Sequence, residues 1–383
     1  MRSGSSFPRA FSPPGLIALI LSTLLAPVAD AAVLSDQFGA GTPIVGVTNV
    51  SASNLLATAE SAEPAHAGEP ATHSLWAVWT APTTGTYTMF TSNSLNTAGR
   101  ALDTVLAVYT GESLSNLAVV AANDDMDTGV LWSRILFRAY AGEKFHIALD
   151  TVDGATGNLN LRILYGGQLM APWLVNKVDN SKLPSGSLTS AVWIVDFWET
   201  VCGACVDELP ELVALQQSLG PRGFTLVGLS GDSDPELVEI FYSNRPVPYP
   251  IAMSNDSATY ALVNGPRASI GYPTKCLVDQ ERKVVARFYG GHNPLAETKA
   301  YYAGIVEPLL RVPSRPRLEI ARENANFRIT WPAIDASYQL ETSADLLAET
   351  WPVVNSTPVL INNRYHLVVP GGQSARFYRL RKP

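Results

Sequence analysis

The sequence contains little cysteine, histidine or charge. Its 383 residues include three cysteines and five histidines, and charged residues make up 16% of the chain. Three cysteines are too few for the dense disulfide framework of a small secreted domain. The net charge of −7 argues against nucleic acid or an anionic membrane surface as a partner. No glycine-rich phosphate loop joins a strand to a helix, so the sequence gives no reason to expect a nucleotide-dependent enzyme.

Long apolar runs are scarce too, and the main one lies near the N-terminus. Gly15 to Leu25 is apolar, follows Arg2 and Arg9, and precedes the small-residue pattern Ala29-Asp30-Ala31. This arrangement is typical of a secretory signal peptide, here residues 1–32. A retained anchor is the alternative, but the run is short for a bilayer about 30 Å thick. We therefore expect an exported protein, periplasmic or secreted, with no stable membrane span after signal cleavage.

The rest of the chain divides into three regions by periodicity and turn residues. Residues 33–166 contain short apolar or alternating runs separated by glycine and proline, which is typical of a β-sandwich. Residues 167–312 alternate strands with helices, which predicts an α/β sheet covered on both sides. Residues 313–383 follow the proline-rich linker Val312–Pro316 and return to short strands, as in a small second sandwich. The expected fold class is multidomain, a central α/β domain flanked by two all-β sandwiches.

Within the central region, the pattern predicts particular elements. A strand over Val192–Phe197 leads to a helix over Cys205–Leu219, and a strand over Thr225–Leu229 leads to a helix capped by Asp234. A terminal helix is expected over Leu295–Leu310. The buried face of the first helix is expected to contain Leu209, Leu212, Val213 and Leu219.

The two closely spaced cysteines lie where the first of these helices begins. Cys202 and Cys205 are separated by two residues, and a helix N-terminus stabilises a thiolate through its unpaired N–H groups and partial positive charge. Cys202, upstream and more exposed, is expected to be the nucleophile. Cys205 then attacks the mixed disulfide and releases the reduced partner. Asp196, at the end of an apolar strand, is expected to have a raised pKa and to accept the proton of Cys205.

Each of these residues also has a structural interpretation. The pair resembles half of a zinc site, but such a site needs four ligands and His292 and Cys276 do not provide the spacing. A static disulfide is a second alternative. Asp196 fits equally a polar residue held by hydrogen bonds at a strand end. Cys276, on a predicted strand, is interpreted as a small buried hydrophobe, with a third redox thiol as the alternative.

Longer motifs around these positions resemble a known family. Asp196-Phe197-Trp198, followed by Cys202-Gly203-Ala204-Cys205 and by Pro210, resembles the thioredoxin motif. Gly271-Tyr272-Pro273-Thr274 resembles the cis-proline loop of the same family. The long connection that contains Asp232 to Asn264 is similar to that of the exported TlpA/ResA-like branch.

The resemblance implies a thiol-disulfide oxidoreductase that acts on protein thiols and disulfides with an unidentified redox partner. It implies no cofactor beyond the redox-active disulfide. Catalytic roles fall to Cys202, Cys205, Asp196 and Pro273, the last cis and beside the cysteines, where it shields the thiolate. Substrate contacts fall to Trp198, Tyr272, Gly203 and Ala204. Val201 and Ala204 depart from the Trp and Pro common in the family, so the direction of electron transfer stays open.

The N-terminal region resembles a bacterial pre-peptidase C-terminal β-sandwich. The match rests on Trp79-Thr80-Ala81-Pro82, the run from Asp103 to Gly111, and Asn123-Asp124-Asp125. Asp103, Asp124 and Asp125 offer hard oxygen ligands for Ca²⁺, although such residues also cap turns. Trp76 and Trp79 suit either core packing or, if exposed, a glycan.

The C-terminal region, with Trp331, Tyr338-Gln339-Leu340 and Arg376 to Leu380, resembles fibronectin-like terminal modules. It carries no catalytic constellation. The sequence therefore favours an exported thiol-disulfide oxidoreductase. The rival hypothesis is a redox-inactive adhesion or scaffold protein whose domains bind peptides or glycans.

Overall fold

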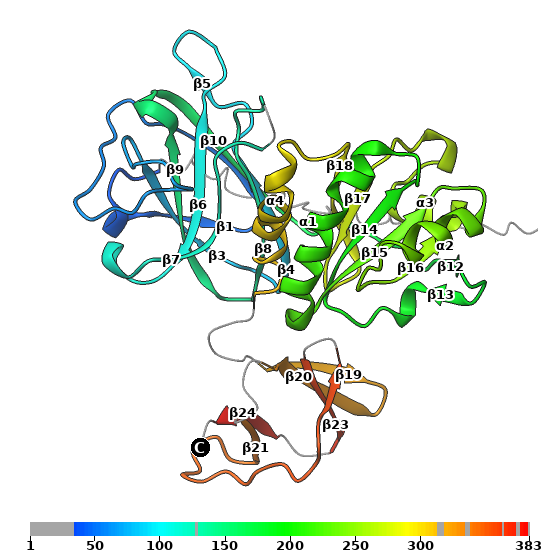
Figure 1. Cartoon of the computed structure of the whole chain (residues 1–383). Coiled ribbons are helices and arrows are strands. Elements are labelled where there is room, and N and C mark those ends of the chain that lie inside the picture. The colour runs from blue at the N-terminus through cyan, green and yellow to red at the C-terminus, as the bar shows by residue number, and fades with distance from the viewer. Residues whose placement is uncertain are drawn as a thin grey trace, which may run out of the picture. The chain divides into compact units, whose positions relative to one another are not determined.

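The computed structural model describes residues 34–126, 129–311, 318–333, 338–361, 364–372 and 376–381. The predicted signal peptide and the linker Val312–Pro316 lie outside these residues. In the part of the chain that is described, no helix is both long and apolar enough to cross a membrane. The helices and strands fall into three successive groups along the chain (Figure 1).

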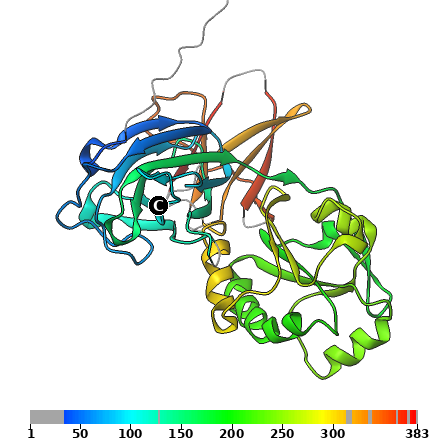
Figure 2. The same ribbon diagram turned by 90° about the horizontal axis from the view of Figure 1, so that it is seen from above.

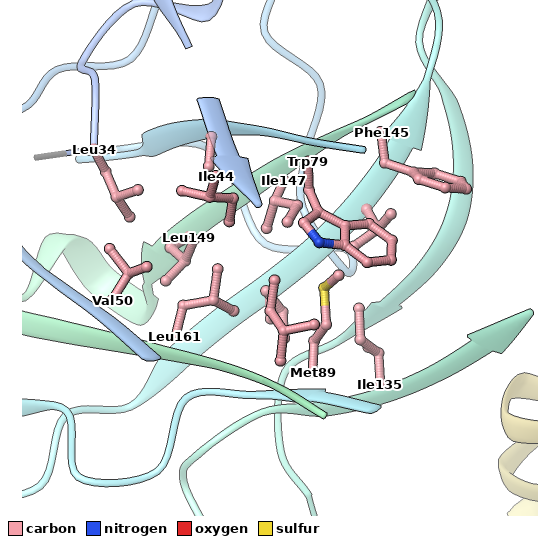
Figure 3. Close-up of a cluster of buried hydrophobic side chains, with 14 of the residues drawn as sticks. Leu34, Ile44, Val50, Trp79, Met89, Ile135, Phe145, Ile147, Leu149 and Leu161 are labelled. Carbon is pink, nitrogen blue, oxygen red and sulfur yellow. The ribbon is translucent and has the colours of Figure 1, made fainter. Parts of the chain in front are cut away.

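The first group consists of strands that form two five-stranded sheets. The strands are β1 (Thr42–Val45), β2 (Thr48–Ser53), β3 (Leu75–Thr80), β4 (Gly85–Phe90), β5 (Leu95–Asn96), β6 (Thr104–Thr110), β7 (Ala118–Asn123), β8 (Arg134–Ala139), β9 (Lys144–Thr151) and β10 (Gly157–Tyr165). One sheet has the order β1-β3-β9-β6-β7, and the other has the order β2-β10-β4-β8 with β5 paired to β10. Because side chains alternate along a strand, each sheet sends apolar residues into one shared core (Figure 3).

Trp79 is a central residue of this core. Its side chain is fully buried, its ring lies 4.7 Å from the ring of Tyr87 and 5.7 Å from that of Phe145, and its indole N–H donates to the carbonyl of Gly46 at 3.0 Å. Trp76 is also fully buried. The core-packing interpretation of both tryptophans is confirmed, because neither ring is exposed to solvent, as contact with a glycan would require.

Replacing Trp79 by alanine is expected to destabilise this region by about 3–5 kcal/mol, because it removes a large buried ring and leaves a cavity. Val119→Ala on β7 is the control: Val119 is 61% exposed, so its loss should cost less than about 0.5 kcal/mol. Hydrogen exchange of peptides from β3 and β9 in increasing urea measures both. Equal protection in the two variants would contradict the central position of Trp79.

The second group forms a mixed sheet with helices. Its elements are β11 (Gln168–Leu169), β12 (Leu174–Lys177), β13 (Lys182–Pro184), β14 (Val192–Trp198), α1 (Gly203–Leu219), β15 (Phe224–Ser230), α2 (Pro235–Ser243), β16 (Ile251–Met253), α3 (Asp256–Leu262), β17 (Thr274–Val278), β18 (Lys283–Tyr289) and α4 (Thr298–Val306). The strand order is β11-β18-β17-β14-β15-β16-β12-β13, with β14 parallel to β15 and antiparallel to β17. Residues of α1 and α4 pack on one face and residues of α3 on the other (Figures 1 and 2). The predicted covering of the sheet on both sides is confirmed.

The buried face of α1 differs from the predicted one. Leu212 and Leu219 are buried as expected, but Leu209 and Val213 are only partly buried. Cys205, Glu208 and Leu215 are buried in their place. The face is rotated because Cys205 and Glu208 lie in line with Leu212 at spacings of three and four residues, and this row contacts the sheet.

Two other helices depart from the sequence-based expectation, while α2 agrees with it. Asp234 caps α2 by accepting a hydrogen bond from the N–H of Glu236 at 2.9 Å. The terminal helix α4 ends at Val306, not at Leu310, because Pro308 lacks the N–H needed to continue it. Helix α3 was not predicted. It is only seven residues long, and its clearest signal is the cap Asn255, which accepts from the N–H of Ala258.

The third group consists of short strands in two small sheets. The strands are β19 (Glu319–Glu323), β20 (Asn326–Pro332), β21 (Gln339–Ser343), β22 (Val359–Ile361), β23 (Arg364–Pro370) and β24 (Phe377–Arg381). The orders are β19-β20-β23-β22 and β21-β24. Residues of both sheets, among them Trp331 and Leu340, belong to one small apolar core.

Candidate redox site at the start of helix α1

Cys202 and Cys205 form a disulfide at the N-terminus of α1. Cys202 is the N-cap residue, and its sulfur accepts a hydrogen bond from the N–H of Cys205 at 3.3 Å. Cys205 is 6% exposed, whereas Cys202 is only partly buried. Cys202 is thus the more exposed of the two cysteines, and a helical N–H donates to its sulfur, which favours a negative charge there.

The loop between β14 and α1 is fixed to the end of β15 by Asp232. The carboxylate of Asp232 accepts hydrogen bonds from the N–H and the hydroxyl of Thr200, at 2.9 and 2.7 Å, and from the hydroxyl of Ser230 at 2.6 Å. Sequence reasoning assigned no role to Asp232. Its signal is weak: a serine at the end of a strand and an aspartate two residues later form a pattern typical of many turns.

Several residues beside the disulfide are small or apolar and reach the surface. Val201 is 83% exposed, Gly203 and Ala204 are exposed, and Tyr272 is partly exposed. The peptide bond between Tyr272 and Pro273 is cis, as the resemblance implied. Among the residues expected to contact substrate, Gly203, Ala204 and Tyr272 therefore reach the surface.

Trp198 lies inside the domain. It is 4% exposed, and its ring lies 5.3 Å from that of Phe241 and 5.1 Å from that of Tyr242, in an apolar cluster with Cys205 and Val238. This placement favours a supporting role for Trp198 over direct contact with a substrate, because a buried indole offers little surface. Tyr242 and Val238 also line a neighbouring pocket of about 500 Å³.

Three charged side chains meet in the interior behind the disulfide. Asp196 and Lys275 are cross-strand partners on β14 and β17, and alternation places both on the sheet face covered by α1. The ammonium of Lys275 lies 2.6 Å from Oε2 of Glu208 and 3.5 Å from Oδ1 of Asp196. The side chains of Lys275 and Glu208 are fully buried. The other oxygen of Glu208 accepts a hydrogen bond from the N–H of His292 at 2.7 Å.

Burial raises the pKa of Asp196, and the negative charge of Glu208 raises it further, while the ammonium of Lys275 opposes both. Oδ1 of Asp196 is buried and has no hydrogen-bond donor. Its contact with the ammonium of Lys275, at 3.5 Å, is an ion pair and not a hydrogen bond, because a hydrogen bond of this kind is shorter. The expected desolvation of Asp196 and the upward shift of its pKa are confirmed.

Sequence reasoning missed Glu208 and Lys275. Each interrupts an otherwise apolar pattern: Glu208 lies on the helix face that carries Cys205 and Leu212, and Lys275 lies in a strand of which every residue is buried. A charged residue at such a position is almost never fully buried unless it is paired. The sequence thus indicated that Glu208 and Lys275 each need a partner, but it did not indicate that they are partners of each other.

Cys276 follows Lys275 and lies on the opposite face of the sheet. It is fully buried in an apolar cluster, and burial raises the pKa of its thiol to about 12. Its interpretation as a small buried hydrophobe is confirmed, since such a thiol is neither accessible nor ionised near neutral pH.

The carboxylates of Asp103, Asp124 and Asp125 come together in the first group of strands. One oxygen from each lies within 4.8 Å of the others. Burial, followed by the charge of Asp103, raises the pKa of Asp124 to about 6. Hard carboxylate oxygens suit Ca²⁺, and calcium binding by these residues stays a prediction.

Comparison with known proteins gives matches to the central region. Residues 171–304 match the family model described as Redoxin. The chain is 25% identical over 121 residues to the thiol-disulfide oxidoreductase ResA of Bacillus cereus, a match that covers 31% of this chain and 66% of that protein. The chain thus spans slightly less than two thirds of that relative. The ResA of Bacillus anthracis matches to the same extent.

Two solved structures are also similar to this part of the chain. A thioredoxin-family thiol:disulfide interchange protein of Chlorobium tepidum is 25% identical, with a TM-score of 0.34, over 39% of this chain and 99% of its own. A thiol:disulfide interchange protein of Bacteroides is 22% identical, with a TM-score of 0.30, over 36% and 90%. The match to the Redoxin family model places a Redoxin-like domain at residues 171–304, with the cysteine pair at the start of its first helix.

Proposed function

We propose that the chain is an exported thiol-disulfide oxidoreductase that exchanges disulfides with protein thiols through Cys202 and Cys205. The observation that carries this proposal is the placement of the disulfide: an accessible sulfur at a helix N-terminus, bonded to a buried sulfur one turn inside. A purely structural disulfide needs neither the accessible sulfur nor the N–H that points at it. Export follows from the predicted signal peptide and is part of the proposal.

The exchange conserves atoms and electrons. In the reducing direction, the Cys202 thiolate attacks a partner disulfide, forms a mixed disulfide and expels one partner thiolate, which takes a proton from water. Cys205 then loses its proton to Asp196 and attacks the sulfur of Cys202. The intramolecular disulfide forms and the second partner thiolate leaves. Two electrons pass from the cysteine pair to the partner, and the reverse sequence oxidises a partner dithiol.

The proposed substrate surface is the exposed rim of the disulfide. Val201, Gly203, Ala204 and Tyr272 leave room for a polypeptide to approach Cys202. Backbone N–H and C=O groups near Pro273 are suited to pair with an extended partner segment, because main-chain pairing gives affinity without demanding a particular sequence. None of these four residues is charged, and the charged side chains of Glu199 and Arg267 lie beside Tyr272.

The test is the reduction potential of the Cys202–Cys205 pair. The full-length protein, with Cys276→Ala to remove the third thiol, is equilibrated in glutathione buffers, alkylated and weighed. A potential near about −270 mV makes the protein a reductase, and one near about −120 mV makes it an oxidant. A pair that never cycles between dithiol and disulfide overturns the proposal and leaves the scaffold hypothesis.

A further inference from the structure

The trio of Asp196, Glu208 and Lys275 has an unbalanced number of charges. One ammonium can neutralise only one of two carboxylates, so a fully ionised trio holds a net negative charge in an apolar interior. Burying an uncompensated charge is costly, so the ionised trio readily accepts one proton, and Cys205 can supply it. The contacts decide which carboxylate binds it.

The two carboxylates have different partners. Glu208 has the ammonium of Lys275 at 2.6 Å on one oxygen and the N–H of His292 at 2.7 Å on the other, so both of its oxygens are compensated. Asp196 has the ammonium at 3.5 Å and an oxygen without a donor. The ring of Tyr302 lies over the ammonium, 5.6 Å from its centroid, and helps to hold it in place.

Other titratable groups also act on Asp196. Charge interactions with Asp196 raise the pKa of Tyr242 on α2, of Tyr249 before β16 and of Cys276 on β17, each of which is already raised more strongly by burial. All three stay protonated near neutral pH. The ring of His292 stacks on Tyr301 at 4.3 Å, and only its backbone N–H contacts the trio. Lys275 is therefore the positive charge that balances this group.

We propose that Lys275 is a positioning residue: its ion pair compensates the charge of Glu208 and leaves Asp196 as the group that takes the proton of Cys205. This inference rests on the proposed function. Glu208 lies one helical turn after Cys205 on the same buried face of α1, so the trio adjoins the resolving cysteine. In this role Lys275 does not react with either sulfur. It changes the charge felt by the two carboxylates that its ammonium contacts.

The test isolates the step in which Cys205 loses its proton. Reduced protein with Cys276→Ala is mixed with 5,5′-dithiobis(2-nitrobenzoate) in a stopped-flow instrument. Cys202 forms a mixed disulfide with the reagent and releases one coloured thiolate. Cys205 then passes its proton to Asp196, attacks the sulfur of Cys202 and releases a second thiolate. Two electrons pass from the cysteine pair to the reagent, and the pH dependence of the second phase reports on the trio.

Lys275→Met is expected to move the midpoint of the second phase to higher pH by about one unit and to slow it about tenfold at pH 7. Without the ammonium, no positive charge favours the ionised form of Asp196, so Asp196 can accept the proton of Cys205 only at higher pH. In an Asp196→Asn background, Lys275→Met should cause no further shift, because the two changes act on the same group. Lys182→Met, which removes an exposed lysine of the same domain, is the control and should leave both phases unchanged.

A second variant covers the case in which Lys275→Met does not fold. Lys275→Met with Glu208→Gln removes a whole ion pair and leaves neither charge alone, which proteins tolerate better than the loss of one partner. Its second phase should again shift to higher pH, because Asp196 loses the nearby ammonium, whose effect on its pKa is larger than that of Glu208.

The inference is overturned if neither Lys275 variant shifts the second phase, or if Lys275→Met shifts it equally in the Asp196→Asn background. Wild-type protein that releases no thiolate, or only the first, overturns the proposed function and this inference with it. A shift of the second phase in Lys275→Met that is absent in the Asp196→Asn background supports the inference.

Discussion

A Cys205→Ser variant is expected to stop disulfide exchange after its first step and to accumulate a mixed disulfide on Cys202. Cys202 retains its position at the helix N-terminus, but no thiol remains one turn inside to displace the partner. Cys202→Ser should form no mixed disulfide and should slow exchange at least about a hundredfold, because a hydroxyl at this position supplies no thiolate. Intact-mass measurement after incubation with a disulfide-containing peptide distinguishes the two variants.

Cys276→Ser is the control for both cysteine variants. Cys276 is fully buried and burial raises the pKa of its thiol to about 12, so its replacement should change neither the trapping nor the exchange rate. Partner trapped on Cys276, or full exchange by the Cys202→Ser protein, would show that the accessible sulfur of α1 is not the nucleophile.

Asp196→Asn is expected to raise the free energy of unfolding at pH 8 relative to the wild type, by an amount that grows with the upward pKa shift of Asp196. Burial raises the pKa of Asp196 above its ordinary value of 3.8, so the folded protein binds this proton more tightly than the unfolded chain does. Stability contributed by the protonated group is present below pH 3.8 and is lost as the pH rises through the higher pKa of the folded state. The asparagine variant avoids that loss, and its advantage should grow from acidic to alkaline pH.

Urea unfolding of the oxidised protein between pH 3 and pH 8 measures this effect. Asp179→Asn is the matched control, since hydrogen bonds from Ser181 lower the pKa of that exposed carboxyl group and the variant should gain nothing at alkaline pH. An advantage of Asp196→Asn that is the same at pH 3 and pH 8 would mean that it comes from packing and not from ionisation. The Lys275–Glu208 pair remains in the variant, so no buried ammonium is left alone.

Much of the redox site was predictable because its signals are local. The position of Cys202 and Cys205 at a helix start follows from the strand Val192–Phe197, the helical periodicity after Cys205 and the stop at Gly220. The burial of Asp196 followed from its place in an apolar strand, and the capping of α2 from Asp234 and Pro235. Each of these depends on neighbours within a few residues, which is the range over which backbone hydrogen bonding and side-chain periodicity act.

The sequence by itself thus determined the strand and helix order of the central region, the helix-start cysteine pair and the desolvation of Asp196. Only the tertiary structure decided which charges surround that carboxylate. Lys275 comes into contact because β17 pairs with β14, and Glu208 because α1 packs on the same face of the sheet, although the two residues are 67 positions apart. Asp232 likewise reaches Thr200, which is 32 positions away in the chain. Ion pairs between residues far apart in the chain depend on strand register and helix packing. Local sequence patterns do not predict either of these.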